Sequence, residues 1–211
     1  MNRLDFLDIS HWQGPVDHEA LACGGILGVI AKCTERTNYF DPTYLTHRAG
    51  ALSAGLAFAS YHFLQHGDVD AQIDWYLSHA EARVGERVVI DYEADSLTID
   101  DLEVSVAALR RARPDLEISV YGSAKLTEDV NAAGDVSWLD GTSLWIARYS
   151  TQEPVIGNAW EYWSAWQYSQ TGCVPGIDGD VDLNTFNGSR AACLAWFGPP
   201  DFLDALNAAA D

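Results

Sequence analysis

The sequence predicts an α/β fold, a small and irregular TIM-like barrel of five β/α units followed by three further β-strands. Strand-like apolar runs alternate with helix-like stretches through five units, which implies a parallel sheet with right-handed crossovers. Several runs, among them VVIDYE and LWIARY, are nearly continuous in apolar residues, as in strands that are buried on both faces. The length of 211 residues is also shorter than the roughly 250 residues of a regular barrel.

Eight apolar runs are predicted to be strands, and the chain between the earlier ones carries helix signals. Asp41-Pro42 has the composition of an N-cap and first helical position before a helix over Thr43–Ser53. An apolar face predicts a second helix over Asp68–Val84, and Thr98, followed by an acid three residues later, starts a third that runs to about Arg113. In chain order, the predicted strands are Leu4–Ser10, Ile26–Cys33, Leu56–Phe63, Arg87–Glu93, Glu117–Gly122, Ser143–Tyr149, Ser164–Tyr168 and Gly179–Asn184.

The last two connections are too short for full crossover helices, which explains the three extra strands. The alternative architecture, a doubly wound open sheet, usually carries a glycine-rich phosphate loop after its first strand. The glycines of Gly24–Gly28 precede a strand instead, so they do not fit that context. We therefore expect one catalytic barrel over residues 1–197 and a C-terminal tail or linker stub over residues 198–211.

The charge balance excludes several classes of partner. The chain has 12 Lys and Arg against 31 Asp and Glu, a formal net charge of −19, and its pI near 4.4 excludes the basic face that nucleic-acid binding requires. The longest uncharged stretch of note, Ala49–Tyr61, is too short to span a membrane, so we expect no membrane partner. Asp5 and Asp8 interrupt the apolar core that a signal peptide needs, so no export signal is expected in this chain.

Metal and thiol chemistry are not indicated by the sequence. The four cysteines form no CxxC pair and are expected to be buried free thiols. The histidines lack HExxH spacing, and the acidic run near residue 180 lacks the glycine and the final acid of an EF-hand. We expect no metal and no cofactor. The cysteines are Cys23, Cys33, Cys173 and Cys193.

Carboxylates follow several predicted strands at the end where barrel enzymes carry their active sites. Asp91 and Glu93 are two residues apart on one strand, so their side chains share a face. Like charge and burial raise the pKa of one carboxyl in such a pair and keep it protonated, while the other stays ionised. A protonated and an ionised carboxyl are the groups that glycoside hydrolysis needs. Asp8 and Asp182, near the ends of other strands, strengthen this interpretation over that of a solvated acidic strand end.

Aromatic residues near the same strand ends favour a sugar ligand. Eight tryptophans in 211 residues is a high number, and aromatic faces suit the CH faces of pyranose rings. Core packing is the alternative for Trp145 and Trp166, and the sequence leaves both open. The residues expected to bind substrate are Tyr61, Tyr121, Trp145, Tyr149, Trp166 and Gln167.

In order along the chain, DFLDISHWQGPVD, GVIAKCTERTNYFDPTY, AGLAFASYHF, VVIDYEAD, LWIARY and WQYSQTGCVPGIDGDVDLNTFNG resemble glycoside hydrolase family 25, the Chalaropsis-type lysozymes. The resemblance runs from about Leu4 to Gly188. It implies a barrel of five α/β units with three extra strands, and β-1,4-N-acetylmuramidase activity on bacterial peptidoglycan. It departs from the family pattern at Cys33 and Arg36, in a segment that usually reads KATEG, and at Trp12, where tyrosine is common.

By this resemblance, Glu93 matches the general acid of the family and Asp91 the acid that supports the reaction centre. Asp8 and Asp182 match two further carboxylates, while Tyr61 and Gln167 match its AYHF-type and WQY segments. The mechanism that we expect is retaining, with the substrate's own 2-acetamido oxygen as nucleophile. A carboxylate nucleophile or an inverting water stays open.

Two other functions stay open at this point: a barrel that binds glycan strands without cleaving them, and an N-acetylglucosaminidase that cuts the other linkage. All four carboxylates are present, which favours an enzyme. Because no export signal is seen, we expect a phage endolysin made in the host cytoplasm and acting on the cell wall, or an extracellular enzyme if a signal was removed. We also expect a monomer.

Overall fold

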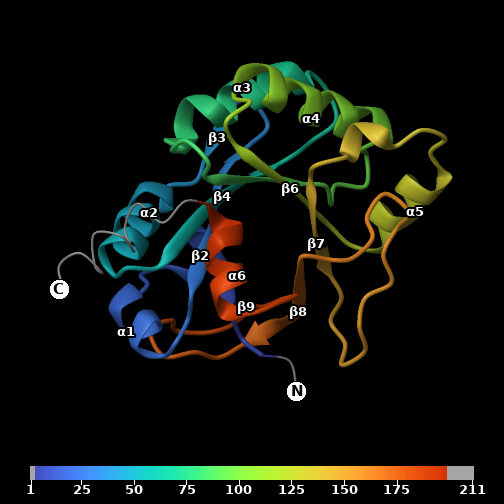
Figure 1. The fold of residues 1–211 in the computed structure, drawn as a ribbon. Helices are drawn as coiled ribbons and strands as arrows, with labels where there is room; N and C mark the ends of the chain where they lie inside the picture. The colour runs from blue at the N-terminus through green and yellow to red at the C-terminus, as the bar shows by residue number, and fades with distance from the viewer. Residues whose placement is uncertain (1–2, 199–211) are drawn as a thin grey trace.

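One sheet closes on itself to form a barrel (Figure 1). The computed structural model describes residues 3–198, and the predicted tail from residue 199 onward lies outside them. Within these residues the strands are β1 (Phe6–Ile9), β2 (Gly28–Glu35), β3 (Tyr39–Phe40), β4 (Ala57–Phe63), β5 (Arg87–Asp91), β6 (Glu117–Gly122), β7 (Ser143–Ala147), β8 (Ala165–Gly172) and β9 (Val181–Phe186).

The strand order is β1-β9-β8-β7-β6-β5-β4-β2-β3, and β1 also pairs with β2, which closes the barrel. Strands β1, β2 and β4 to β8 are parallel to their neighbours, whereas β9 is antiparallel to both β8 and β1. The short β3 pairs with β2 outside the barrel. The predicted α/β barrel is therefore confirmed, and the reversed direction of β9 is a feature that the sequence analysis did not predict.

Five α-helices follow five of the strands, and no helix described here separates β7 from β8 or β8 from β9. This is the predicted arrangement of five β/α units and three further strands. A sixth α-helix follows β9 and lies across the centre of the barrel in Figure 1. The helices are α1 (His18–Cys23), α2 (Tyr44–Ser53), α3 (Val69–Ala80), α4 (Ile99–Ala112), α5 (Ala124–Ala132) and α6 (Arg190–Phe197), with short 3-10 turns η1 (His11–Gln13) and η2 (Ser137–Leu139).

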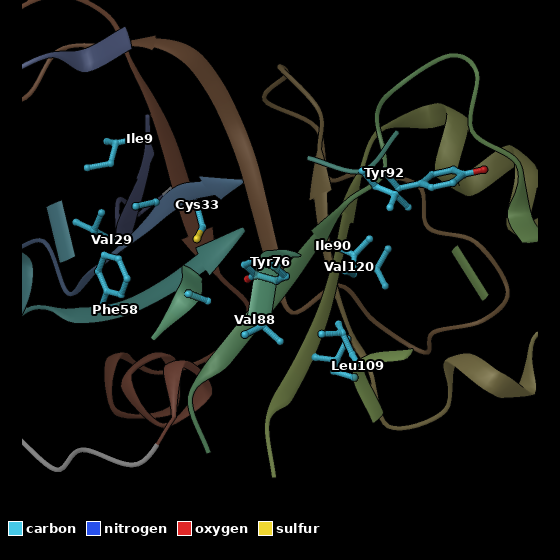
Figure 2. Close-up of a cluster of buried hydrophobic side chains, with 14 of the residues drawn as sticks. Ile9, Val29, Cys33, Phe58, Tyr76, Val88, Ile90, Tyr92, Leu109 and Val120 are labelled. Carbon is cyan, nitrogen blue, oxygen red and sulfur yellow. The ribbon is translucent and has the colours of Figure 1, made fainter. Parts of the chain in front are cut away.

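Apolar side chains form two clusters, one on each face of the sheet. The outer cluster lies between the barrel and its helices and includes Ile90 and Tyr92 (Figure 2). The inner cluster includes Phe6 and Trp145 of the barrel together with Phe197 of α6. Because α6 fills the amino-terminal end of the barrel, the end that remains for polar side chains is the carboxyl-terminal end of the parallel strands.

The helix signals have different outcomes. Thr98 caps α4 with the predicted reciprocal bonds to Asp101, and Asp68 caps α3. Helix α3 ends at Ala80, earlier than predicted, because Glu81 takes a left-handed φ of 50°. Helix α2 begins at Tyr44 with Thr43 as its N-cap, so the assignment of Asp41 as N-cap is wrong.

Strand β8 continues past the predicted end at Tyr168. Its polar segment SQTG has the composition of a turn, but the backbone pairs with β9 across two irregularities in register. Only residues 173–180 connect β8 to β9, which is too short for the crossover that a parallel pair needs. The two strands therefore form a hairpin and run antiparallel.

All four cysteines are free, but only two fit the prediction of buried thiols. Cys33 and Cys193 are buried, whereas Cys23 and Cys173 are exposed. Burial raises the pKa of the Cys193 thiol to about 12, so this thiol is inert near neutrality. Among the helices of residues 3–198, none is both long and apolar enough to cross a membrane.

Candidate active site

The structure brings all four predicted carboxylates to one end of the barrel, which we call the mouth. Asp8, near the end of β1, lies opposite Asp182 in the antiparallel register of β1 and β9. The reversed β9 places the start of that strand beside the ends of the parallel strands. Asp91 ends β5, and Glu93 follows two residues later. The predicted convergence of acids is present, but Asp182 reaches the mouth from the beginning of its strand.

Asp8 is buried and accepts hydrogen bonds from two amides. The Gln167 Nε2 group donates to both carboxylate oxygens at 3.0 Å, and Asn184 Nδ2 donates to Oδ2 at 2.7 Å. Burial and the charge of Asp182 raise the pKa of Asp8, and these two amides lower it in part. Burial also raises the pKa of Asp182. The facing carboxyls therefore favour a state that keeps a proton between them.

Both amides are held in one orientation by aromatic donors. The hydroxyls of Tyr121 and Tyr149 donate to Gln167 Oε1 at 2.8 and 2.9 Å, which turns the amino group of Gln167 toward Asp8. The indole of Trp145 donates to Asn184 Oδ1 at 2.8 Å and orients that amide in the same way. A single network thus fixes Asp8 from β1, β6, β7, β8 and β9 together.

Asp91 is buried like Asp8, but fewer hydrogen bonds stabilise its carboxylate. Its Oδ1 atom finds no hydrogen-bond partner among the residues that the structure describes. Burial and then the charge of Glu93 raise the pKa of Asp91 well above its usual range, and the nearby Lys32 opposes this shift. Lys32 lies on β2 and binds Glu35 at 2.8 Å. The Oδ1 oxygen is buried and has no partner in the described part of the chain, which adds to the cost of keeping Asp91 ionised.

Glu93 combines partial exposure with a raised pKa. Burial and then the charge of Asp182 raise the pKa of Glu93, and the polar Tyr121 hydroxyl nearby partly opposes this rise. These shifts favour the protonated carboxyl that a general acid requires.

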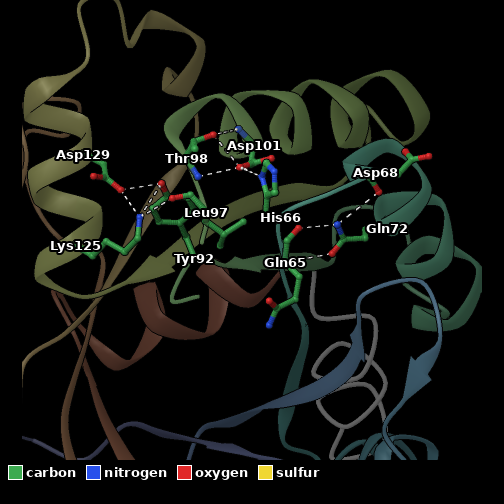
Figure 3. Close-up of polar contacts among 10 residues, drawn as sticks. All are labelled: Gln65, His66, Asp68, Gln72, Tyr92, Leu97, Thr98, Asp101, Lys125 and Asp129. Carbon is green, nitrogen blue, oxygen red and sulfur yellow. Dashed lines mark hydrogen bonds and ion pairs between the residues drawn. The ribbon is translucent and has the colours of Figure 1, made fainter. Parts of the chain in front are cut away.

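The chain around Glu93 is anchored on both sides (Figure 3). The preceding residue, Tyr92, points away from the mouth and donates its hydroxyl to Asp129 at 2.8 Å. Lys125 donates to the Leu97 carbonyl at 2.9 Å, which holds the loop that follows. Tyr92 is held on the outer side of the barrel. Because neighbouring residues in an extended chain point to opposite sides, Glu93 faces the mouth.

The aromatic residues expected to bind substrate divide into two groups. Tyr61, Tyr121 and Tyr149 belong to the mouth, and the charges of Asp91 and Asp8, after burial, raise the pKa of Tyr61. The indoles of Trp145 and Trp166 are only 1% and 2% exposed, so their expected role as ligand surfaces does not fit the structure.

The two tryptophans are buried for different reasons. Trp145 lies inside the barrel and supports Asn184 from below. Trp166 belongs to the outer cluster and donates to the Arg148 carbonyl at 2.8 Å. Residues alternate along β8, so its two neighbours Ala165 and Gln167 point inward instead. The strand that directs Gln167 into the mouth therefore directs Trp166 away from it.

Trp12, which the sequence marks only as a departure from the family pattern, is a further exposed aromatic residue. It lies on η1 directly after β1, and 83% of it is exposed. Its indole contacts the ring of His11 with centroids 4.6 Å apart, and His11 bonds Asp41 at 3.0 Å. The capping-box pattern of Ser10 and Gln13, shortly after Asp8, is a sequence signal for this position, because it predicts a tight turn that contains Trp12.

No group of three or more potential ligands among residues 3–198 is arranged to hold a metal ion. The mouth instead offers carboxyls that differ in exposure and in hydrogen bonding, with tyrosine hydroxyls and amides around them. Such a site suits acid-assisted cleavage of a bond between sugars, in which one carboxyl donates a proton and another stabilises positive charge.

Comparison with known proteins agrees with this chemistry. Residues 7–177 match the model of Glycosyl hydrolases family 25. Lysozyme M1 of Streptomyces globisporus is 30% identical over 206 residues, covering 90% of this chain and 69% of its own length. The N,O-diacetylmuramidase of Chalaropsis sp is 26% identical over 203 residues, covering 83% of this chain and 94% of that protein.

A solved structure extends the likeness to three dimensions. The bacterial lysozyme from Streptomyces coelicolor superposes with a TM-score of 0.76 at 26% identity, covering 92% of this chain and 96% of that one. The family model covers well over half of the chain, and the barrel superposes on that lysozyme over most of its length. The chain belongs to family 25 of the glycosyl hydrolases.

Proposed function

We propose that the protein hydrolyses the β-1,4 bond between N-acetylmuramic acid and N-acetylglucosamine in bacterial peptidoglycan, as a 1,4-β-N-acetylmuramidase. The observation that carries the proposal is Glu93, a carboxyl with a raised pKa beside three further acids in an open barrel mouth. Relatives named as a lysozyme and a muramidase support the same reaction. The site of action is then the bacterial cell wall.

In the proposed reaction Glu93 gives its proton to the oxygen that leaves with N-acetylglucosamine. The 2-acetamido oxygen of the muramic acid residue attacks the anomeric carbon, so that one C–O bond forms as the glycosidic C–O bond breaks. Asp91 and Asp182 stabilise the positive charge of the cyclic intermediate. Water, deprotonated by Glu93, then opens the ring and restores the acid. Asp91 and Glu93 extend from the same strand, so both act from one side of the sugar.

Asp8 acts as a positioning residue in this scheme. Its carboxylate is occupied by Gln167 and Asn184, so it contributes charge near Asp182 and order to the mouth rather than a nucleophile. Tyr61 offers its hydroxyl to the sugar, whereas the hydroxyls of Tyr121 and Tyr149 donate to Gln167 and can only accept from the sugar. We add Trp12 as an exposed face against which a pyranose ring stacks.

The test is digestion of purified peptidoglycan, followed by borohydride reduction and mass spectrometry of the new ends. Muramitol ends from the wild type support a muramidase. Glucosaminitol ends show that the enzyme cuts the other linkage, and no new ends with retained binding identify a glycan-binding barrel.

The stereochemical course has a separate test. NMR of the earliest product resolves its anomers before they equilibrate. The proposed participation of the acetamido group predicts the β-anomer first, and an initial α-anomer would show that water inverts the centre directly.

A further inference from the structure

A second cleft, outside the carboxylate cluster, borders the mouth. It has a volume of about 480 Å³ and lies between the end of β7 and the extension of β8 past Tyr168. Its lining residues are Tyr149, Ser150, Thr151, Tyr168, Ser169, Gln170 and Thr171.

The lining carries hydroxyls, an amide and two aromatic rings, but no charged side chain. This composition is unusual in a chain with a net charge of −19. Hydroxyls and an amide form hydrogen bonds with neutral polar groups, and tyrosine rings offer apolar faces. The cleft therefore matches an uncharged sugar better than an ionic ligand, which has no counter-charge there.

Tyr149 joins the cleft to the mouth. Its hydroxyl donates to Gln167 at 2.9 Å, and Gln167 in turn holds both oxygens of Asp8. The same residue lines the cleft. Tyr149 therefore lies between the cleft and the acid cluster, and a glycan strand bound at one site would reach the other past this residue.

We propose that this cleft binds an N-acetylglucosamine unit of the same glycan strand, away from the bond that is cut. The inference rests on the proposed muramidase function and adds a substrate contact to it. N-acetylglucosamine is the uncharged sugar of the strand, whereas muramic acid carries a carboxylate or a stem peptide. The acidic stem peptide is the alternative occupant, and both the uncharged lining and the negative net charge disfavour it.

The test compares glycan strands of two lengths, both freed of stem peptides: the shortest oligosaccharide that the wild type cleaves, and long strands. The variant Tyr168→Ala removes a ring from the cleft. We expect the ratio of kcat/KM on long strands to kcat/KM on short ones to fall about tenfold, the order that loss of one polar or stacking contact costs. The effect is expected in KM.

Two further variants keep the result interpretable. Gln170→Glu replaces an exposed side chain by one of nearly the same shape, so the fold is kept while the cleft gains a negative charge. This variant is also expected to lower the ratio of kcat/KM on long strands to kcat/KM on short ones. Tyr162→Ala is the matched control, since Tyr162 is 61% exposed and lines a different cleft. The control is expected to leave the ratio at the wild-type value.

Two results would overturn the inference. Equal ratios in the wild type, Tyr168→Ala and Gln170→Glu would show that the cleft does not contact the strand. A loss seen only on strands that keep their stem peptides would assign the cleft to the peptide. Failure of the muramidase proposal is separate, because the wild type would then produce no muramitol ends from strands of either length.

Discussion

Each carboxyl of the mouth has its own surroundings, and these surroundings give the four acids different roles. Asp8 is bound by amides and Asp91 has an oxygen with no partner among residues 3–198, whereas Glu93 and Asp182 are partly exposed. Burial raises the pKa of all four, and like charges add to the shifts of Asp8, Asp91 and Glu93. The site therefore holds fewer negative charges near neutrality than its four carboxyls suggest.

In the proposed mechanism, the alkaline limb of the pH–activity profile reports the loss of the proton on Glu93. Because the charge of Asp182 raises the pKa of Glu93, the variant Asp182→Asn is expected to move this limb toward lower pH. The measurement is kcat/KM on soluble glycan strands as a function of pH. A limb that stays in place while activity falls would show that Asp182 does not act on the proton of Glu93.

The buried charge of Asp91 has a cost in stability. Its pKa is higher in the folded than in the unfolded chain, so the stability that its proton contributes is complete at low pH and is lost as the pH rises through the folded value. Asp91→Asn is therefore expected to raise Tm at neutral pH by several degrees, where about 1 kcal/mol corresponds to roughly 2–4 °C.

The same variant has an internal control in pH. The Tm advantage of Asp91→Asn should shrink as the pH falls toward the usual range of an aspartate, because the wild-type carboxyl is then protonated as well. Thermal unfolding followed by circular dichroism measures both values. A variant that is less stable than the wild type by the same amount at every pH would contradict this account.

Residue types and alternation predicted part of the site. The two-residue spacing of Asp91 and Glu93 placed both on the inner face, and the outward position of Tyr92 agrees. The same alternation puts Trp166 and its neighbour Gln167 on opposite faces, so the expectation that both meet the substrate does not fit the structure. Periodicity does not predict the exposure of Trp12, because that exposure depends on a local turn.

Among the elements, the β8–β9 hairpin departs most from expectation. The apolar runs located all the barrel strands, because strands buried on both faces have a continuous signal. Strand direction has no such signal in the chain, and the polar end of β8 has the composition of a turn. Antiparallel pairing of β9 places Asp182 opposite Asp8. The direction of β9, which the sequence does not predict, therefore completes the acid cluster.

A glycine allows this hairpin to pack closely. A Cβ atom at Gly172 would approach the Leu183 side chain to 2.3 Å. Gly172→Ala is expected to lower the free energy of unfolding by about 1–3 kcal/mol, the usual cost of overpacking, and to reduce activity by displacing β9. Gly134→Ala, whose added Cβ meets nothing within 4 Å, is the matched control in urea unfolding. Equal stability of the two variants would show that the hairpin tolerates this displacement.

The whole molecule is a barrel with one filled end and one reactive end. Helix α6 places Trp196 and Phe197 against Phe6 inside the amino-terminal end, and Arg87 donates there to Ser119 and Ser143. The filled end leaves the mouth as the place where a glycan strand meets the acids. The phage origin and the monomeric state expected from the sequence stay predictions.

The net charge of −19 is expected to weaken binding of the enzyme to the cell wall. Anionic wall polymers repel such a protein, and salt screens this repulsion because the Debye length is only about 10 Å at 0.1 M ionic strength. Lysis of intact walls is therefore expected to rise as salt is added from low ionic strength. Turnover of short neutral oligosaccharides, the control, should change little. Wall lysis that falls steadily with salt would contradict this expectation.

The central claim is that Glu93 donates the proton to the departing sugar, and leaving-group dependence tests it most directly. The measurement compares kcat/KM of the wild type and Glu93→Gln on natural glycan strands and on an oligosaccharide with an activated aryl leaving group. We predict a loss of about 10²–10⁴-fold on the natural strand, the usual contribution of a general acid. We predict a far smaller loss on the aryl glycoside, which departs without a proton. An equal loss on both substrates, or activity retained on the natural strand, would contradict the account.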